Sequence, residues 1–287
     1  MKKSIFTGVV ALTLVLSGCG AKMDHSNMNH EGNNTAIPQA GEMSHGENHG
    51  GGDTTAKDDN LKVTWKLTAE KPQSNQNDDL TIQVQDKDGK PVQDFEIQHE
   101  KLMHLIIVSK DLSYFEHIHP EYKGNGLFTI TTKFPNGGDY KLYADFVPKG
   151  GEKSVKEHVV TVEGAAPHVA ALNPDTDKPK AIENKEVTLS FDKLKAGEEL
   201  TINFNIKNET TKQPISNLQP YLGAVGHVVI ISEDTGLYLH VHPMDEKATG
   251  PDAKFMTTFP KSGTYKIWGQ FQHEGKVFTV PFTVKVP

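Results

Sequence analysis

The chain has 287 residues, and its 37 Asp and Glu against 30 Lys give a formal net charge of −7, with no Arg at all. Surfaces that bind nucleic acid are basic and usually contain Arg, so nucleic acid is excluded as an expected partner. The single Cys, Cys19, excludes a disulfide within the folded part, a CxxC redox pair and a blue-copper centre.

The N-terminus has the pattern of an export signal. Lys2 and Lys3 precede an apolar run over residues 5–16, which ends in Leu-Ser-Gly-Cys. Such a segment predicts a signal peptide over residues 1–18 and is too short for a stable membrane span. Its end resembles the bacterial lipobox, which implies that Cys19 becomes the lipidated first residue. We therefore expect an extracytoplasmic protein held at the cell membrane by a lipid anchor.

Residues 19–60 form a polar segment rich in Gly, Asn, Ser and Thr, which cannot bury enough apolar surface to fold and is expected to be disordered. Its Met and His residues are a candidate for metal capture, because thioether and imidazole groups suit Cu(I) and imidazole also suits Cu(II). The alternative is an inert spacer. The candidate residues are Met23, His25, Met28, His30, Met43, His45 and His49.

Short alternating runs begin at about residue 61 and predict antiparallel strands, because apolar and polar residues alternate and Gly, Pro, Asn and Asp recur every eight to twelve residues. Two halves, residues 61–163 and 185–287, each have the size of a small immunoglobulin-like β-sandwich of about seven strands. A Pro- and Ala-containing linker, residues 164–184, joins them. The predicted fold is all-β, with two tandem sandwiches after a disordered tail.

The two halves are copies of one another. Four aromatic positions near the end of each copy recur at a separation of 125 residues and are expected in the core. They are Phe134, Tyr140, Tyr143 and Phe146 in the first copy, and Phe259, Tyr265, Trp268 and Phe271 in the second.

A histidine pattern also occurs in each copy, within MHLIIVSKDLSYFEHIHP (residues 103–120) and GHVVIISEDTGLYLHVHP (residues 226–243). Imidazole is the commonest protein metal ligand, so these duplicated positions predict a metal site of three histidines in each repeat. Each pair of equivalents is 123 residues apart: His104, His117 and His119 match His227, His240 and His242.

Each pattern is predicted to form one hairpin with a four-residue turn, Lys110–Ser113 or Glu233–Gly236. Counting outward from the turn pairs the first histidine with the third, and the middle histidine with Ile106 or Val229. Opposed residues and residues two apart share a face, so the three imidazoles should converge at the open end of the hairpin. A turn that differs by one residue would move the first histidine to the other face.

The alternative is that these histidines are structural and hydrogen-bonded within a core. Four further histidines lack a counterpart and are expected at the surface: His99, His158, His168 and His273. Met103 and Met244 adjoin the clusters without being duplicated, and they are candidates for additional soft ligands.

The D-L-T-I-Q-V and D-G-K-P-V motifs (residues 79–92) and the F-P…G-x-Y-K-L motif (residues 134–142) resemble exported bacterial lipoproteins with YtkA-like or FixH-like β-sandwich domains. The resemblance covers both repeats. It implies the fold and an envelope context in which several members are associated with copper handling. It assigns no ligands.

Three functions are compatible with the sequence. The first is a lipid-anchored protein that binds copper, with zinc as the alternative ion, for sequestration, delivery or tolerance, with a copper-handling envelope protein as a possible partner. The second is an envelope adhesion or assembly module whose histidines are structural. The third is a zinc-dependent hydrolase, which would need a general base. No Asp or Glu is duplicated near the histidines, so the protein is not expected to be an enzyme.

Overall fold

The structure, a computed structural model, describes residues 60–168, 171–175 and 178–287, and its named elements are the strands β1–β17. The predicted all-β fold with two tandem immunoglobulin-like sandwiches is therefore confirmed. The predicted signal peptide, Cys19 and the Met/His residues of the tail lie outside the described residues. Within the described residues, no helix is long and apolar enough to cross a membrane.

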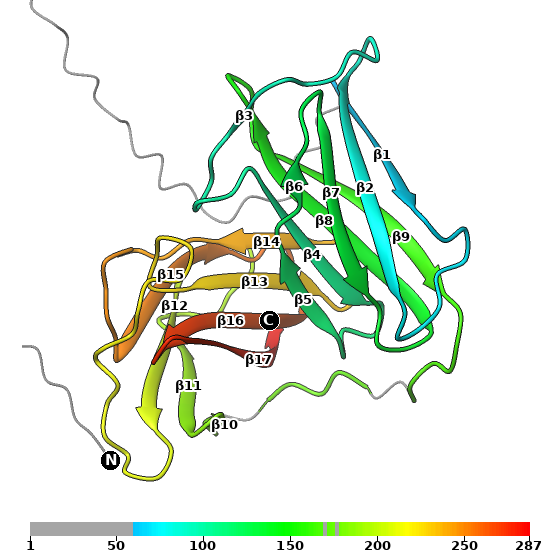
Figure 1. Cartoon of the computed structure of the whole chain (residues 1–287). Coiled ribbons are helices and arrows are strands. Elements are labelled where there is room, and N and C mark those ends of the chain that lie inside the picture. Colours follow the sequence, from blue (N-terminus) through cyan, green and yellow to red (C-terminus); the bar gives the residue numbers. More distant parts are fainter. Residues whose placement is uncertain (1–59, 169–170, 176–177) are drawn as a thin grey trace, which may run out of the picture. The chain divides into compact units, whose positions relative to one another are not determined.

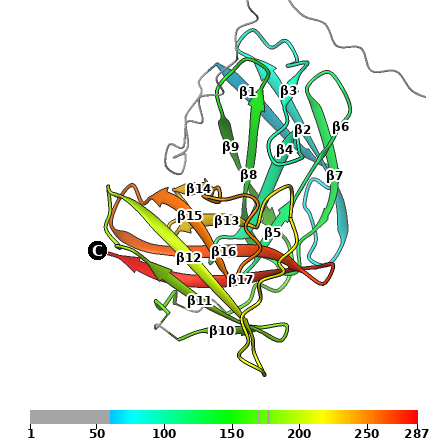
Figure 2. The same ribbon diagram turned by 90° about the vertical axis from the view of Figure 1, so that its left-hand side faces the viewer.

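Repeat 1 consists of two antiparallel sheets (Figures 1 and 2). The first sheet has the order β1 (Leu61–Leu67), β2 (Asn77–Asp86), β7 (Leu127–Lys133), β6 (Glu121–Tyr122). In the second sheet β8 (Gly138–Pro148) is central and pairs with β3 (Phe95–Glu96), β4 (Met103–Ser109) and β9 (Ser154–Val162), while β5 (Phe115–Ile118) pairs with β4.

Repeat 2 has the same two-sheet plan, without strands equivalent to the short β3 and β6 in the described residues. One sheet has the order β10 (Lys180–Ile182), β11 (Lys185–Phe191), β12 (Glu199–Asn208), β15 (Asp252–Thr258). The other has the order β14 (Tyr238–Val241), β13 (His227–Ser232), β16 (Gly263–His273), β17 (Lys276–Val286).

Each repeat has its own core between its two sheets, as expected for a sandwich. Six of the eight duplicated aromatic residues lie in these cores. The other two, Tyr143 and Trp268, belong to a third core formed by residues of both repeats. The prediction that all eight are core residues is correct, but six lie inside a single sandwich and two lie in the core between the repeats.

The third core explains why β4 and β13 are apolar without alternation. All residues of both strands are buried. Leu105 and Ile107 face the sandwich core of repeat 1, whereas Ile106 and Val108 face the third core. A strand that is buried on both faces has no solvent-exposed face, so its sequence need not alternate between apolar and polar residues.

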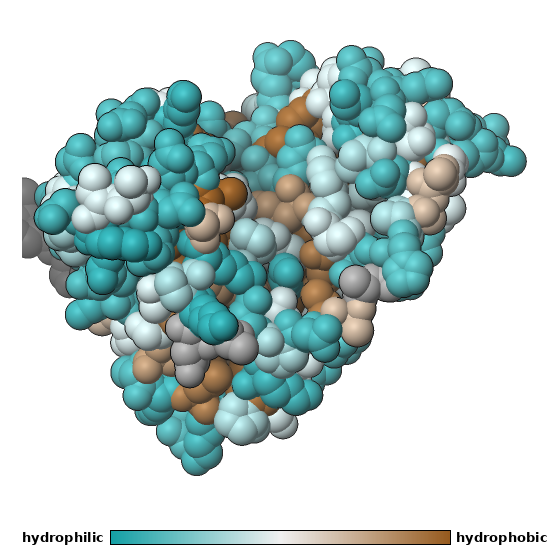
Figure 3. Space-filling model, turned by 90° about the horizontal axis from the view of Figure 1, so that it is seen from below, coloured by the Kyte–Doolittle hydropathy of each residue, from teal (hydrophilic) through white to brown (hydrophobic). Residues whose placement is uncertain are grey.

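The third core is therefore the junction between the outer faces of two sheets, β5-β4-β8 of repeat 1 and β14-β13-β16 of repeat 2. Two aromatic stacks cross it: Tyr143 on Tyr238, with ring centroids 4.9 Å apart, and Phe115 on Trp268, at 4.6 Å. The two stacks are equivalent to each other, because Trp268 is the counterpart of Tyr143 and Tyr238 is the counterpart of Phe115, so the junction has approximate twofold symmetry. Figure 3 shows hydrophobic residues gathered in a hollow along the middle of one face, within a mostly hydrophilic surface.

We predict that Trp268→Ala lowers the free energy of unfolding by about 3–5 kcal/mol, because it removes a nearly fully buried ring from the junction and leaves a cavity. Urea unfolding measures the loss. The matched control is Trp65→Ala, since Trp65 is only half-buried and stacks on His158. An equal or smaller loss at position 268 would contradict the packing of the two repeats described above.

Candidate metal centre

The register of both hairpins is the one that the sequence predicts. Ile106 pairs with His117 in repeat 1, and Val229 pairs with His240 in repeat 2. The amide of Ser109 donates to the carbonyl of Tyr114, and that of Ser232 donates to Leu237, so that each turn has four residues.

An aspartate in each turn fixes this length. The Oδ1 atom of Asp111 accepts the amide of Ser113 at 3.1 Å, and the Oδ1 atom of Asp234 accepts the amide of Gly236 at 2.9 Å. Such Asx turns hold a tight loop locally, and the loop length decides which face the histidines occupy.

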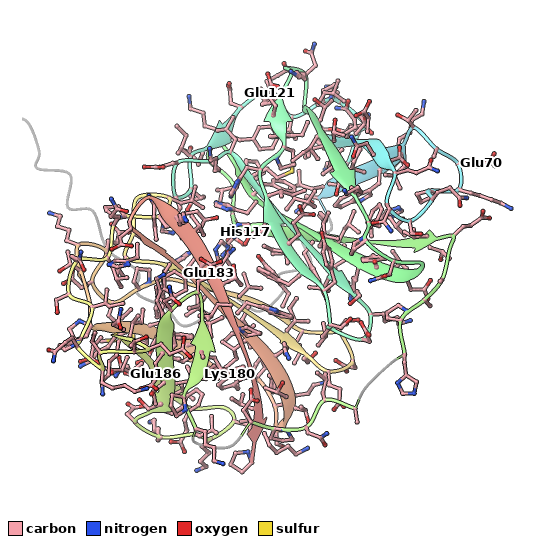
Figure 4. The ribbon with its side chains drawn as sticks, turned by 60° about the horizontal axis from the view of Figure 1, so that its bottom comes forward. Glu70, His117, Glu121, Lys180, Glu183 and Glu186 are labelled. Carbon is pink, nitrogen blue, oxygen red and sulfur yellow. The ribbon has the colours of Figure 1, made fainter. Side chains whose placement is uncertain are left out.

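The first triad, defined as His104, His117 and His119, is compact. The Nδ1 atom of His104 lies 2.9 Å from Nε2 of His117 and 3.2 Å from Nε2 of His119. Candidate donor atoms of the three residues all lie within 4.8 Å of one another. Two of the rings are buried and that of His119 is half-buried. Figure 4 shows His117 where the ribbons of the two repeats meet.

The outer nitrogens of two rings contact carbonyl oxygen atoms, which accept hydrogen bonds. The Nε2 atom of His104 lies 2.9 Å from the carbonyl oxygen of Gln98, and Nδ1 of His117 lies 2.7 Å from Oε1 of Gln270. The Gln270 amide is oriented by its Nε2 atom, which donates to Thr279. Each outer nitrogen therefore carries the proton of a neutral ring. The inner nitrogens, 2.9 Å apart, then face each other with lone pairs, and a cation placed between them removes this repulsion.

The second triad, defined as His227, His240 and His242, repeats this arrangement more loosely. The Nδ1 atom of His227 lies 3.5 Å from Nε2 of His240. The outer nitrogens again contact acceptors, Nε2 of His227 the carbonyl of Tyr221 at 3.1 Å and Nδ1 of His240 the carboxylate of Asp145 at 2.9 Å. The same inner nitrogens as in the first triad are therefore left without protons.

Each repeat orients the middle histidine of the other. Asp145 on β8 and Gln270 on β16 are equivalent positions, 125 residues apart. Asp145 accepts from His240, and Gln270 accepts from His117. Partners of this kind fix the tautomer and direction of a metal-binding imidazole. The Asp145 carboxylate also contacts the hydroxyl of Tyr238 and Nζ of Lys153.

The two triads form one cluster across the junction. The ring centroid of His104 lies 5.1 Å from that of His240 and 6.2 Å from that of His227, and His117 lies 5.8 Å from His240. Each repeat therefore has the triad that the sequence predicts, and the two triads, whose relation the sequence leaves open, lie side by side. The hairpins place the histidines on the outer face of each sheet, and those two faces pack together.

One cluster residue was assigned wrongly from the sequence. His99 is half-buried, with its ring centroid 4.4 Å from His242 and 4.9 Å from His227, although its lack of a counterpart predicted a surface position. His273 is also buried, and its Nε2 contacts Asn217. His168 is exposed as expected. Duplication identifies residues that are present in both copies. It could not identify His99, which is present in one copy only.

The neighbouring methionines do not join the cluster. Met103 is buried in the sandwich core of repeat 1, on the face of β4 opposite to His104. Met244 is 51% exposed, and its sulfur contacts the hydroxyl of Thr201. Among the residues that the structure describes, the candidate ligands at the junction are therefore imidazoles.

The surroundings favour neutral imidazoles. Burial lowers the pKa of His119 and of His227 to about 3, with further lowering by neighbouring histidines. Burial also holds the pKa of His117 and of His240 well below 6.5. Neutral imidazole is the form that binds a metal ion, so the cluster is ready to coordinate at neutral pH.

The chain is thus a tandem β-sandwich protein with a histidine cluster at the junction of its two repeats. A family model described as a domain of unknown function, DUF8832, matches it twice, at residues 55–164 and 180–287. The chain therefore belongs to the DUF8832 family, with two copies of the domain. The match fits the tandem repeat, and the resemblance to YtkA-like or FixH-like lipoproteins stays a prediction.

Several solved structures are similar to the chain at low identity. The Escherichia coli adhesin FdeC is 11% identical, with 79% of this chain and 65% of that chain covered and a TM-score of 0.28. The Yersinia pseudotuberculosis adhesin InvE is 13% identical, with 78% and 60% covered and a TM-score of 0.26. A two-domain fibronectin type III segment of chicken tenascin is 12% identical, with 77% and 97% covered and a TM-score of 0.22.

The chain thus spans less than two thirds of the length of the two adhesin chains. At these scores the fold class rests on the strand pairing described above, and no role is transferred from the neighbours. No curated protein matches the chain in sequence.

We predict that the chelated, metal-free protein loses stability as the pH falls below about 6.5. Histidines whose folded-state pKa is lowered bind fewer protons folded than unfolded, so their stabilisation is complete above 6.5 and is lost as the pH falls towards about 3. Each such histidine contributes up to about 1.4 kcal/mol per pH unit. Urea unfolding at pH 7.5, 6.5 and 5.5 measures the slope, and a flat profile over this range would contradict the buried, neutral cluster.

Proposed function

We propose that the protein is an extracytoplasmic metal-binding protein whose site is the histidine cluster between its two repeats. The observation that carries this proposal is the pair of inner nitrogens, Nδ1 of His104 and Nε2 of His117, which lie 2.9 Å apart while their outer nitrogens contact acceptors. A hydrogen-bonded structural pair would place a proton between the inner nitrogens. An ion explains their lone pairs facing each other.

Copper is the ion that we propose, with zinc as the alternative. Sites made only of imidazoles suit both, and at equal availability Cu(II) binds such a site more tightly than Zn(II). The Met and His residues of the segment that follows Cys19 add soft donors, which favour copper over zinc. Thiolate chemistry is not involved, because Cys19 is the only Cys.

Sequestration, delivery or tolerance at the cell envelope is the role that fits such a site best. His104 is 1% exposed and His227 is fully buried, so these two rings are shielded from water, whereas His119 is half-buried. The signal-like N-terminus and the lipobox-like Cys19 support a lipid-anchored location outside the cytoplasm. A copper-handling envelope protein would then supply or accept the ion.

An envelope adhesion or assembly module is the second candidate, and the adhesins among the structural neighbours are compatible with it. In that case the histidines would be structural, and chelation would leave the stability of the protein unchanged.

A hydrolase is not proposed. No enzyme is among the family and neighbours named above, and the carboxylate at the cluster, Asp145, is hydrogen-bonded to the outer nitrogen of His240. It therefore orients a ring, whereas a general base must reach a metal-bound water.

We predict that His119→Ala together with His242→Ala removes most of the bound copper, because each triad loses an imidazole. Metal analysis after dialysis measures copper per chain in full-length protein. The matched control is His168→Ala, which removes an exposed histidine outside the cluster.

A full-length variant in which the seven tail Met and His residues are changed to Ser separates the tail from the cluster. Unchanged copper in the double Ala variant, with loss in the tail variant, would contradict the junction site and assign binding to the tail. Unchanged stability on chelation, without bound metal in the wild type, would favour the adhesion or assembly module.

We predict that Cys19→Ala abolishes acylation and moves the protein from the membrane fraction to the soluble envelope or secreted fraction. The lipobox-like sequence makes Cys19 the acceptor of the lipid. Cell fractionation with metabolic labelling by a fatty-acid analogue measures both effects. Ser17→Ala is a control that keeps a small residue before Cys19, and its distribution should match that of the wild type. Membrane retention of the Cys19→Ala variant would contradict a lipid anchor.

A further inference from the structure

His99 occupies a tight turn between β3 and β4 in which two consecutive residues have left-handed backbone conformations. The φ angles are +44° at His99 and +65° at Glu100. The flanking residues, Gln98 and Lys101, hydrogen-bond to each other in both directions, with N···O distances of 2.8 and 3.0 Å. A left-handed conformation is unfavourable for side chains other than Gly and Asn, and residues that keep one often do so because their position is needed.

This turn belongs to repeat 1, but its histidine contacts the triad of repeat 2. The ring of His99 lies 4.4 Å from His242 and 4.9 Å from His227, whereas it lies 6.5 Å from His104 of its own repeat. The carbonyl of Gln98, one residue earlier, accepts from His104. The same turn therefore orients a ring of the first triad and brings an imidazole to the second.

Ring spacing allows four imidazoles around one ion. With a metal–nitrogen bond of about 2 Å, ring centroids around a tetrahedral ion are roughly 5 Å apart. The spacings around the second triad are 4.4 and 4.9 Å from His99, 5.3 Å between His240 and His242, and 5.8 Å between His227 and His240. The ring centroids of His99 and His240 are 6.4 Å apart.

The equivalent turn in repeat 2 lacks this histidine. Tyr221 and Ala224 correspond to Gln98 and Lys101 and form the same isolated bridge, and Leu222 corresponds to His99, with a φ of +51°. The carbonyl of Tyr221 accepts from His227, as that of Gln98 does from His104. Repeat 2 thus has the orienting carbonyl, that of Tyr221, but no imidazole at position 222.

We infer that His99 is a fourth ligand of the second triad, so that the duplicated motif makes two unlike sites: four imidazoles in one and three imidazoles with an open position in the other. The inference rests on the proposed metal-binding function and deepens it. A site with all four positions filled by protein retains its ion, whereas a site with an open position accepts an external ligand. The first triad is then where an ion enters or is handed over, and the second is where an ion is held.

The test is a titration of full-length, metal-free protein with Co(II), whose visible spectrum reports its coordination. Wild type is expected to bind two ions at the junction with different affinities. His99→Leu should weaken one of the two by about tenfold or more and leave the other unchanged, since one ligand of one site is lost. Leucine is the residue that repeat 2 tolerates in the same backbone conformation, so the variant should fold.

Two further variants are titrated alongside His99→Leu. His168→Leu removes an exposed histidine outside the cluster and should leave both affinities unchanged. Leu222→His offers a nitrogen at the equivalent position and should strengthen the weaker site.

Azide gives a readout that a merely structural role of His99 would not change. In the wild type, azide should alter the spectrum of one of the two Co(II) ions, the one at the open site. In His99→Leu it should alter both.

Two Co(II) ions of unchanged affinity and unchanged azide response in His99→Leu would overturn the fourth ligand and leave the proposed function standing. A wild type that binds no Co(II), Cu(II) or Zn(II) at the junction would overturn both.

Discussion

The packing of the two sheets against each other through their outer faces is the constraint on which the rest of the structure depends. In a single sandwich these faces would meet water, and an apolar run such as that of β4 would be exposed. Here Ile106 and Val108 meet their counterparts Val229 and Ile231 in one shared core. Because opposed and alternate residues share a face, the same packing brings the first and middle histidines of each hairpin into the junction. The cluster is thus a property of the pair of repeats and of neither repeat alone.

The electrostatics of the junction follow from this burial. Taking imidazoles out of water disfavours their charged form, and rings so close together repel one another when protonated. The neutral rings then have their protons fixed on the outer nitrogens, by two backbone carbonyls and by the side chains of Asp145 and Gln270. What remains inside is a set of lone pairs that point towards one another. A bound cation would turn this repulsion into coordination, and metal binding would accordingly strengthen the contact between the repeats.

Much of this arrangement could be predicted from the sequence, and the rest could not for physical reasons. Period-two patterns gave the strands, and the four-residue turns gave the pairing of Ile106 with His117. Local patterns contain no information on which sheets of two domains will pack, so the sharing of the cluster was not predictable. His99 was missed because its position depends on that packing and on a left-handed turn. The proposal of copper rests on the Met and His residues that follow Cys19, because imidazole sites suit several ions.

X-ray absorption at the copper edge of the loaded, full-length protein tests the central claim most directly, because it reports the atoms bound to the metal. We predict a first shell of nitrogen at about 2.0 Å with the outer-shell scattering of imidazole rings, retained when the seven tail Met and His residues are changed to Ser. A first shell dominated by sulfur at about 2.3 Å, which disappears in the tail variant, would contradict the account. The metal would then belong to the Met/His segment, and the junction histidines would be structural.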